Sequence, residues 1–165
     1  MKYLYCFKCG SKVEKIEVEH RERAYCKKCD IILYENPIPT VVALIRRGEK
    51  VLLIRRGIEP GKGGWALPGG FIEMNESPES AILREVYEET NLKGKEAKLF
   101  DVIHYNSVFY SSILIISYEV LINDFEPARP GDDAIEVHFF DFDDRPRLIF
   151  EPHENLLQKW LKREN

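Results

Sequence analysis

The sequence predicts an α+β fold, in which a mixed sheet with few helices is preceded by a small separate module. Five short segments rich in β-branched or apolar residues are separated by polar turns, and only two segments have the period of an amphipathic helix. All four cysteines lie within the first 35 residues, which contain few apolar side chains. We therefore expect two domains, residues 1–35 and residues 36–165.

The composition is that of a globular, mildly acidic protein. Hydrophobic residues make up 44% and charged residues 32% of the chain, and 24 basic against 28 acidic side chains leave a formal net charge of −4. This balance argues against non-specific nucleic-acid binding through a basic surface. No apolar run reaches the roughly 18 residues of a membrane span, and the first residues do not resemble a signal peptide. We expect a cytoplasmic protein with no membrane partner.

The N-terminal module carries two CxxC pairs, made by Cys6, Cys9, Cys26 and Cys29. Residues 10–25 separate the pairs, which is the spacing of a zinc ribbon with four thiolate ligands. The alternatives are two disulfides or free thiols, and a cytoplasmic setting disfavours the disulfides. Because sulfur would fill all four positions, we expect the Zn²⁺ to be structural and to supply folding energy that the small core lacks.

Zinc ribbons often touch nucleic acid, and this one contains several lysines and arginines. Glutamates from Glu14 to Glu22 alternate with them, however, so a continuous phosphate-binding stripe is not expected. We interpret the ribbon as a structural or dimerisation module.

Hydrophobic patterning places the remaining strands and the last helix. Residues 40–45 read as a buried strand, and residues 51–54 are predicted to return beside it as a hairpin. A loop at residues 104–112 follows the third strand. The predicted strands are 40–45, 51–54, 98–103, 113–122 and 137–142, and the last helix is 151–162 with Leu156, Leu157, Trp160 and Leu161 on one face.

The most informative stretch is the helix that begins after Ser77. A Ser N-cap, Pro78 at the first helical position and an acid in the first turn mark its start. At about 100° per residue, Glu85, Glu88 and Glu89 fall on one stripe beside an apolar stripe. Like charges on neighbouring turns repel, and a hard divalent cation would reverse that effect. The alternative is an ordinary solvated acidic face.

Glycines crowd the loop before this helix, where Trp65-Ala66-Leu67-Pro68-Gly69-Gly70 leads into it. Glycine allows the backbone to approach a ligand closely. We interpret Trp65 as a packing residue under the loop. Arg55 and Arg56 end the preceding strand and are candidates for binding a substrate phosphate, the alternative being a solvated or salt-bridged arginine.

The spacing of this region resembles the Nudix box of nucleoside-diphosphate-X hydrolases. Five residues separate Gly70 from Glu76, and seven more precede Arg84-Glu85-Val86-Tyr87-Glu88-Glu89-Thr90-Asn91-Leu92. The one departure is Asn91, where the family usually has glycine, and Asn is the next best residue for the left-handed conformation after a helix. The resemblance implies the Nudix α/β/α sandwich with a mixed sheet and a nucleotide pyrophosphatase activity.

The resemblance also implies the chemistry of the site. Mg²⁺ or Mn²⁺ would bridge the substrate diphosphate and neutralise its charge. The metal ligands would be the Gly70 carbonyl and the carboxylates of Glu76, Glu85, Glu88 and Glu89. Arg84 would pair with a box glutamate and orient it. Family members differ in the acid that serves as general base, and the candidates outside the box are Asp132, Asp133, Glu136 and Glu119.

The order of ribbon, Tyr-x-Asn-Pro junction, glycine loop and box is similar to a zinc-ribbon Nudix subgroup that acts on ADP-ribose, FAD or NADH. Such an enzyme would cleave the diphosphate of a small nucleotide substrate and release AMP. The NADH enzymes carry a Ser-Gln-Pro-Trp-Pro-Phe-Pro motif after the box, where this chain has Tyr105-Asn106-Ser107-Val108-Phe109-Tyr110. This difference points to FAD or ADP-ribose. Ribbon-bearing members are often homodimers, so a homodimer is implied as well.

Two other classes of function remain open at this point. One is a housecleaning hydrolase of modified nucleoside triphosphates or diadenosine polyphosphates, which shares the box and differs in the pocket. The other is a non-enzymatic nucleotide sensor. The complete set of box carboxylates weighs against the sensor, which does not need all of them.

Several aromatic side chains are candidates for stacking on the substrate base, and each is also consistent with packing in the core. They are Phe71, Tyr105, Phe109 and Tyr110. His104, His138 and His153 have no partner at a ligand-like spacing. We interpret these histidines as structural or surface residues.

Overall fold

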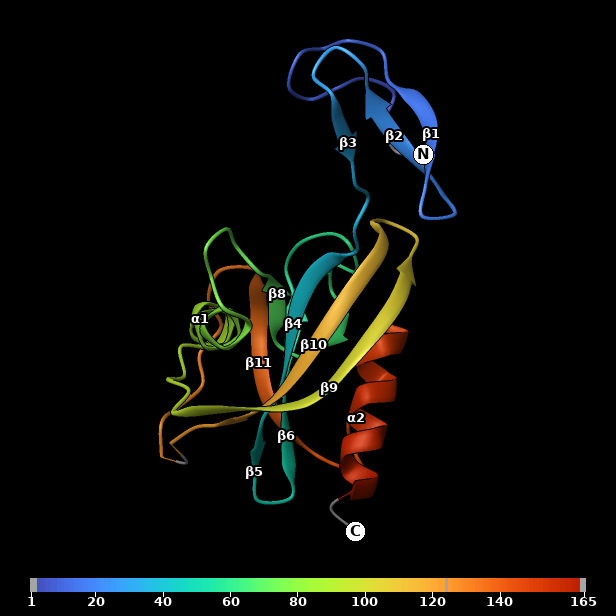
Figure 1. Ribbon diagram of the computed structural model, residues 1–165. Helices are drawn as coiled ribbons and strands as arrows, with labels where there is room; N and C mark the ends of the chain where they lie inside the picture. Colours follow the sequence, from blue (N-terminus) through green and yellow to red (C-terminus); the bar gives the residue numbers. More distant parts are fainter. Residues whose placement is uncertain (1–2, 124, 164–165) are drawn as a thin grey trace. The chain divides into compact units, whose positions relative to one another are not determined.

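The structure, a computed structural model, describes residues 3–123 and 125–163. It divides the chain into two compact units, Met1–Pro37 and Ile38–Asn165 (Figure 1). The first unit is a three-stranded antiparallel sheet in the order β1-β2-β3. Its strands are β1 (Glu14–Val18), β2 (Arg21–Cys26) and β3 (Ile31–Leu33). Its small core contains Val13, Ala24 and Leu33 together with Cys6 and Cys26.

The second unit contains two four-stranded sheets and two helices. The mixed sheet has the order β8-β4-β10-β9, in which only the β4–β10 pair is parallel, and the other sheet has the order β11-β6-β5 with β7 paired to β6. The elements are β4 (Ile38–Leu44), β5 (Arg46–Arg47), β6 (Lys50–Arg56), β7 (Trp65–Ala66), β8 (Gly69–Phe71), α1 (Pro78–Thr90), β9 (Glu96–Ser107), β10 (Ser111–Leu121), β11 (Ala134–Asp141) and α2 (Glu151–Arg163).

The alternation of side chains along β4 builds two cores on opposite faces of the sheet. Val41 and Ala43 pack in one cluster with Ile82 and Val86 of α1. Val42 and Leu44 pack in the other cluster with Leu156, Leu157 and Trp160 of α2. Because successive strand residues point to opposite faces, each helix covers one face and the layers are helix, sheets, helix (Figure 1). This α+β arrangement is the predicted fold class.

The prediction that residues 40–45 and 51–54 pair as a hairpin is wrong. β4 lies in the mixed sheet, whereas β6 lies in the other sheet, where it pairs with β11. Both edges of β4 are already filled, by β8 and by β10. Only the chain reversal around β5 keeps the hairpin contact, including the hydrogen bond from the Leu52 N–H to the Ile45 carbonyl over 2.9 Å.

The loop predicted at residues 104–112 is mostly strand. β9 continues to Ser107 and β10 begins at Ser111, and these two residues pair directly, so the turn between them is short. The polar and aromatic side chains of this region therefore project from a hairpin tip, where one face of each strand is solvent-exposed. That exposure explains why the segment lacks the apolar pattern of a buried strand.

Candidate active site

Helix α1 begins and ends at the residues that the sequence indicates. The Ser77 hydroxyl accepts a hydrogen bond from the Ser80 N–H over 3.1 Å, and Pro78 occupies the first turn. At the other end Asn91 adopts a left-handed φ of 56°, and its N–H donates to the Tyr87 carbonyl. These caps fix the register of the helix and so fix which side chains share its acidic stripe.

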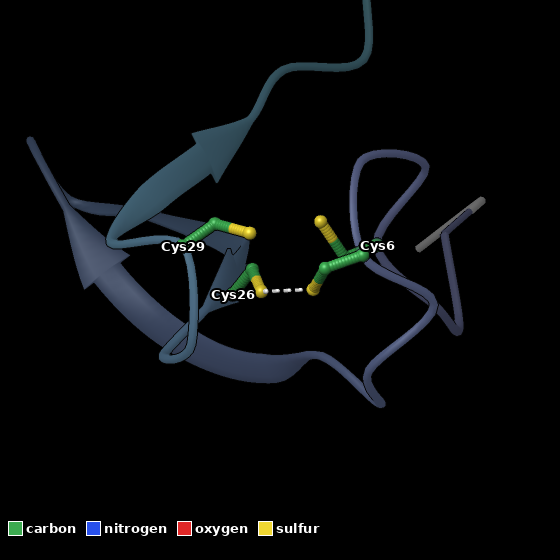
Figure 2. A group of neighbouring side chains, drawn as sticks. Cys6, Cys26 and Cys29 are labelled. Carbon is green, nitrogen blue, oxygen red and sulfur yellow. Dashed lines mark hydrogen bonds between the residues drawn. The ribbon is translucent and has the colours of Figure 1, made fainter.

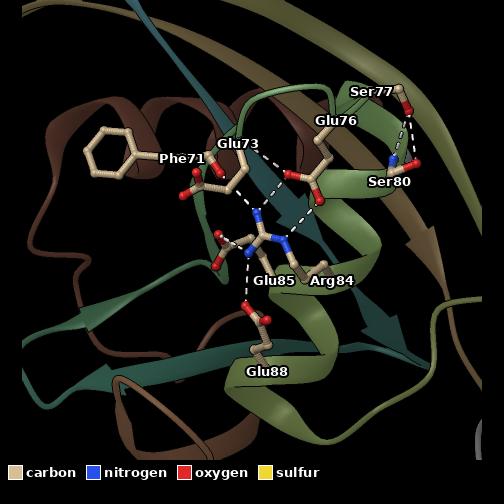
Figure 3. Close-up of polar contacts among 8 residues, drawn as sticks. All are labelled: Phe71, Glu73, Glu76, Ser77, Ser80, Arg84, Glu85 and Glu88. Atoms are coloured by element: carbon tan, nitrogen blue, oxygen red, sulfur yellow. Dashed lines mark hydrogen bonds and ion pairs between the residues drawn. The ribbon is translucent and has the colours of Figure 1, made fainter.

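Arg84 joins most of the acidic stripe into one network (Figure 3). Its Nε and one terminal nitrogen donate to the two oxygens of Glu76, each over 2.9 Å, and its other terminal nitrogen donates to Glu85 and Glu88, each over 2.8 Å. It also donates to the Phe71 carbonyl over 3.0 Å. The hydrogen bonds from Arg84 lower the pKa of Glu76. One guanidinium therefore offsets the repulsion among three carboxylates and fixes their orientation.

Glu89 lies deeper than the other box acids. Its residue is 4% exposed, and its carboxylate accepts the Gly69 N–H over 2.9 Å. Burial raises the pKa of Glu89 to about 8, while the Gly69 N–H and the charge of Arg56 act in the opposite direction. Burial also raises the pKa of Glu85. A buried carboxylate whose negative charge is offset by few neighbouring groups is typical of a site that binds a cation or a substrate.

The two glycines of β8 allow the box acids to approach the backbone. A Cβ on Gly70 would lie 2.4 Å from a carboxylate oxygen of Glu85. A Cβ on Gly69 would lie 2.1 Å from the Val41 carbonyl oxygen, and the φ of Gly69 is +152°. A side chain at Gly69 would therefore meet the backbone of β4, whereas one at Gly70 would push the Glu85 carboxylate from its place.

These acids face a cavity of about 890 Å³. Phe71 lies on one wall, and its ring meets that of Tyr110 edge-on with centroids 5.3 Å apart. Tyr105 and Phe109, from the same β9–β10 hairpin, line this aromatic wall as well. The size and the mixture of apolar and charged walls suit a nucleotide-sized ligand.

The donor set on the acidic wall fits a hard divalent cation. Arg84 and Gly69 occupy one oxygen each of Glu85, Glu88 and Glu89. The second oxygen of each carboxylate has no hydrogen-bond partner in the described parts of the chain. Carboxylate oxygens are the ligands that Mg²⁺ and Mn²⁺ prefer.

The cysteines of the first unit form a separate cluster (Figure 2). The sulfur atoms of Cys6, Cys9, Cys26 and Cys29 all lie within 4.8 Å of one another, and those of Cys9 and Cys26 are 3.6 Å apart. All four cysteines are free. Thiolates at the corners of a tetrahedron with Zn–S bonds of about 2.3 Å are roughly 3.8 Å apart, so the cluster fits Zn²⁺.

Comparison with known proteins decides the family. A model of the NUDIX domain matches residues 36–161. The chain belongs to the Nudix family. It is an enzyme of the Nudix hydrolase type, a family that hydrolyses pyrophosphate bonds of nucleotide compounds and generally needs divalent metal ions. None of the described helices is long and apolar enough to cross a membrane.

Two curated relatives illustrate the range of the match. The chain is 38% identical over 135 residues to an ADP-ribose pyrophosphatase of Methanocaldococcus jannaschii. The aligned region is 81% of this chain and 78% of the relative. The chain is 37% identical over 100 residues to a NAD-capped RNA hydrolase NudC of Mannheimia succiniciproducens. The aligned region is 58% of this chain and 38% of the relative.

Solved Nudix structures share the fold. A NUDIX hydrolase from Nitrosomonas europaea superposes with a TM-score of 0.75 at 28% identity, covering 97% of this chain and 91% of the other. A bifunctional NMN adenylyltransferase/ADP ribose pyrophosphatase from Francisella tularensis, complexed with AMP and a manganese ion, gives a TM-score of 0.64 at 28% identity, covering 80% of this chain and 43% of the other.

The two arginines that end β6 have different surroundings in this Nudix domain. Arg56 lines the cavity, and its Nε donates to the Pro60 carbonyl over 2.8 Å. Arg55 does not line the cavity. Its guanidinium donates to the Gly63 carbonyl over 2.8 Å and to Glu136 over 2.6 Å. Adjacent strand residues point to opposite sides, so only one arginine of the pair faces the site.

The acids outside the Nudix box also separate into two groups. Asp132 and Asp133 line the cavity. Glu136 is paired with Arg55, and Glu119 accepts the Trp160 indole N–H over 3.1 Å on the α2 side of the sheet. The structure therefore brings two of the four candidate bases to the cavity that the box acids line.

Sequence reasoning missed several residues that line the cavity, and two of them are titratable groups described next. One is Glu73, whose position between Gly70 and Glu76 in the box loop could have indicated it. The other is His153, which we interpreted as structural or surface; it lies at the start of α2, and no local pattern marks it. His138 is an exposed residue, as expected, and Trp65 packs on Phe140 with ring centroids 4.8 Å apart.

Proposed function

We propose that this Nudix hydrolase cleaves the diphosphate of an ADP-linked compound, with ADP-ribose as the main substrate and FAD and NADH as related ones, and releases AMP. The observation that carries the proposal is one cavity whose walls combine the carboxylates of Glu85, Glu88 and Glu89 with the aromatic ring of Phe71. The acids suit a metal-bound diphosphate, and the aromatic wall suits a purine base. Similarity to an ADP-ribose pyrophosphatase along most of both chains supports this choice.

Mg²⁺ or Mn²⁺ is the cofactor that this acidic wall suits. The residues that would hold it are Glu85, Glu88 and Glu89, with Gly70 lining the same cavity and Glu76 joined to Glu85 and Glu88 through Arg84. When bound, the metal would neutralise charge on the diphosphate and activate water. Arg84 is a positioning residue, because it holds one oxygen of Glu85 and of Glu88 and leaves the other oxygen free.

The other cavity residues would bind the substrate and accept a proton. Arg56 would bind a phosphate oxygen, and Phe71 and Tyr105 would stack on the base. Asp132 or Asp133 would orient the attacking water and take its proton, since both face the same cavity as the box acids. Arg55 has no part in this proposal because its guanidinium is bound elsewhere.

The first unit is proposed to be a zinc ribbon in which Cys6, Cys9, Cys26 and Cys29 hold one structural Zn²⁺. Domain limits at residues 1–35 and 36–165, a cytoplasmic location and a homodimer complete the proposal. The small core of the ribbon and its four adjacent sulfur atoms support a folding role for the metal.

A second candidate is hydrolysis of an NAD-linked compound, because the chain is similar to proteins named NAD-capped RNA hydrolase NudC. The NudC match covers a smaller share of this chain than the ADP-ribose pyrophosphatase match does. The sequence at Tyr105–Tyr110 also differs from the NADH enzymes. We therefore place ADP-ribose first.

Product analysis by chromatography and mass spectrometry tests the choice. The enzyme is incubated with Mg²⁺ or Mn²⁺ and with ADP-ribose, FAD, NADH, diadenosine polyphosphates or oxidised dGTP. AMP from ADP-ribose at the highest kcat/KM supports the proposal. Faster release of ATP or pyrophosphate from the last two substrates would assign the chain to the housecleaning class, and no turnover of any compound would favour a sensor.

A further inference from the structure

His153 and Arg56 contact the same aromatic ring, that of Phe150. The ring of His153 packs against Phe150 with centroids 5.2 Å apart, and the Arg56 guanidinium lies 5.4 Å from the centroid of the same ring. Both residues line the cavity. The mechanism proposed above gives no role to His153.

The His153 ring is neutral and has an unused hydrogen-bonding edge. Neither ring nitrogen has a partner within residues 3–123 and 125–163, and Nδ1 is fully enclosed. Burial, with a smaller effect of Arg56, lowers the pKa of His153 to about 3. A neutral imidazole has one N–H, and an enclosed N–H without an acceptor is rarer than an enclosed lone pair. The proton is therefore placed on Nε2, which can donate to a ligand.

The neighbours of His153 indicate which part of a substrate it meets. His153 and Arg56 contact the same Phe150 ring and line the same cavity, so the two side chains are neighbours there. If the acids and Arg56 bind the diphosphate, His153 meets the group attached to it, and in a nucleoside diphosphate compound that group is a sugar.

We propose that His153 donates a hydrogen bond from Nε2 to a hydroxyl oxygen of the substrate's sugar and selects substrates by that hydroxyl. This inference rests on the proposed function. A site built to bond a hydroxyl rejects an analogue that lacks it, because the polar group of the protein is then left without a partner. The neutral ring adds this selectivity without adding charge beside Arg56.

The test combines His153→Leu with analogues of ADP-ribose that each lack one ribose hydroxyl. The wild-type enzyme is expected to lose about 10-fold in kcat/KM on one of these analogues, the value of one hydrogen bond. His153→Leu is expected to lose about the same factor on ADP-ribose but to leave that one analogue within about twofold of wild type. His153→Gln, which keeps an N–H donor, should recover part of the loss.

The controls separate this inference from the proposed function. His138→Leu, a histidine outside the cavity, should change no substrate ratio, and melting curves should show that each variant is folded. Equal losses for His153→Leu on every substrate would overturn the inference alone. If His153→Leu fails to fold, a wild-type enzyme that treats all the analogues alike still overturns it. A wild-type enzyme with no turnover of ADP-ribose would overturn the proposed function and this inference together.

Discussion

The backbone N–H of Gly69 donates to the buried carboxylate of Glu89 over 2.9 Å. The bond ties β8 to the last turn of α1 across 20 positions of the sequence. It holds Glu89 beside the cavity although burial disfavours its charge. The fold therefore fixes Glu89 in place and leaves its negative charge only partly balanced. A bound metal ion would balance that charge.

Glu89→Gln is expected to lower kcat at saturating Mg²⁺ by about 10²-fold or more. The amide oxygen can still accept the Gly69 N–H, so the fold is retained while the charge is lost. Steady-state kinetics on ADP-ribose measure the change. Glu96→Gln, an exposed acid on β9, serves as the control. Turnover of Glu89→Gln within about threefold of wild type would show that Glu89 holds no metal.

Gly70→Ala is expected to lower kcat/KM by at least about 10-fold, because the new methyl group would occupy the position of the Glu85 carboxylate. Gly94→Ala is a matched control, since its Cβ would lie 2.4 Å from a methyl carbon of Leu83, a flexible side chain outside the cavity. That control should reduce the melting temperature and leave kcat/KM unchanged. Equal activity of both variants would contradict the close approach of Glu85 to β8.

Phe71→Ala is expected to raise KM for ADP-ribose by about 10-fold with kcat within about threefold of wild type, because stacking on the base stabilises the ground state and the transition state alike. Initial rates over a range of substrate concentrations give both constants. Phe125→Ala removes a ring that is 94% exposed and lies outside the cavity, and should change neither constant. An unchanged KM for Phe71→Ala would remove Phe71 from the base site.

The cysteine cluster predicts one zinc ion per chain, measured by elemental mass spectrometry. Cys26→Ser should release the metal and abolish the NMR signals of the folded ribbon. The fluorescence of Trp65 and Trp160 should stay native, because both tryptophans of the chain lie in the second unit. His20→Ala, on the turn between β1 and β2, should keep its zinc. Full zinc content in Cys26→Ser would contradict the assignment.

Glu154 anchors the start of α2 to Arg145, whose side chain is only 7% exposed. Hydrogen bonds from Arg145 lower the pKa of Glu154 to about 2, from an ordinary value of 4.5. The ion pair therefore stabilises the fold above about pH 4.5, and this contribution is lost as the pH falls toward 2. Glu154→Gln should lower the free energy of unfolding at pH 7 by roughly 3 kcal/mol, and by less at pH 3.

Urea unfolding followed by tryptophan fluorescence measures this effect at both pH values. Asp141→Asn is the matched control, because Asp141 and Lys50 form an exposed pair with an N–O distance of 3.3 Å. Its loss should be less than about 1 kcal/mol. A Glu154→Gln loss of the same small size would show that the buried pair does not anchor α2.

Local spacing in the sequence was sufficient for the parts of the site that lie close together in the chain. The cap at Ser77, the helical period and the left-handed residue Asn91 place Glu85, Glu88 and Glu89 on one stripe, and the structure has that helix. The two CxxC pairs likewise predict four adjacent sulfur atoms. In both cases the residues are joined by short segments with few possible conformations.

The pairing of the strands and the direction in which their side chains point depend on the tertiary structure. The sequence predicted a hairpin between residues 40–45 and 51–54, but β4 already has a partner on each edge, so β6 pairs with β11 in another sheet. Arg55 and Arg56 are indistinguishable in the sequence, and only the packing of β6 shows which one faces the cavity.

The sequence by itself determined the family-specific helix, its acids and the cysteine cluster, because each depends on contacts within a few turns of chain. Only the tertiary structure decided that Asp133 and His153, which follow the box by more than 40 residues, line the same cavity as Glu89. Long-range neighbours depend on how whole strands and helices pack. That packing depends on the complete core, so no short sequence pattern predicts it.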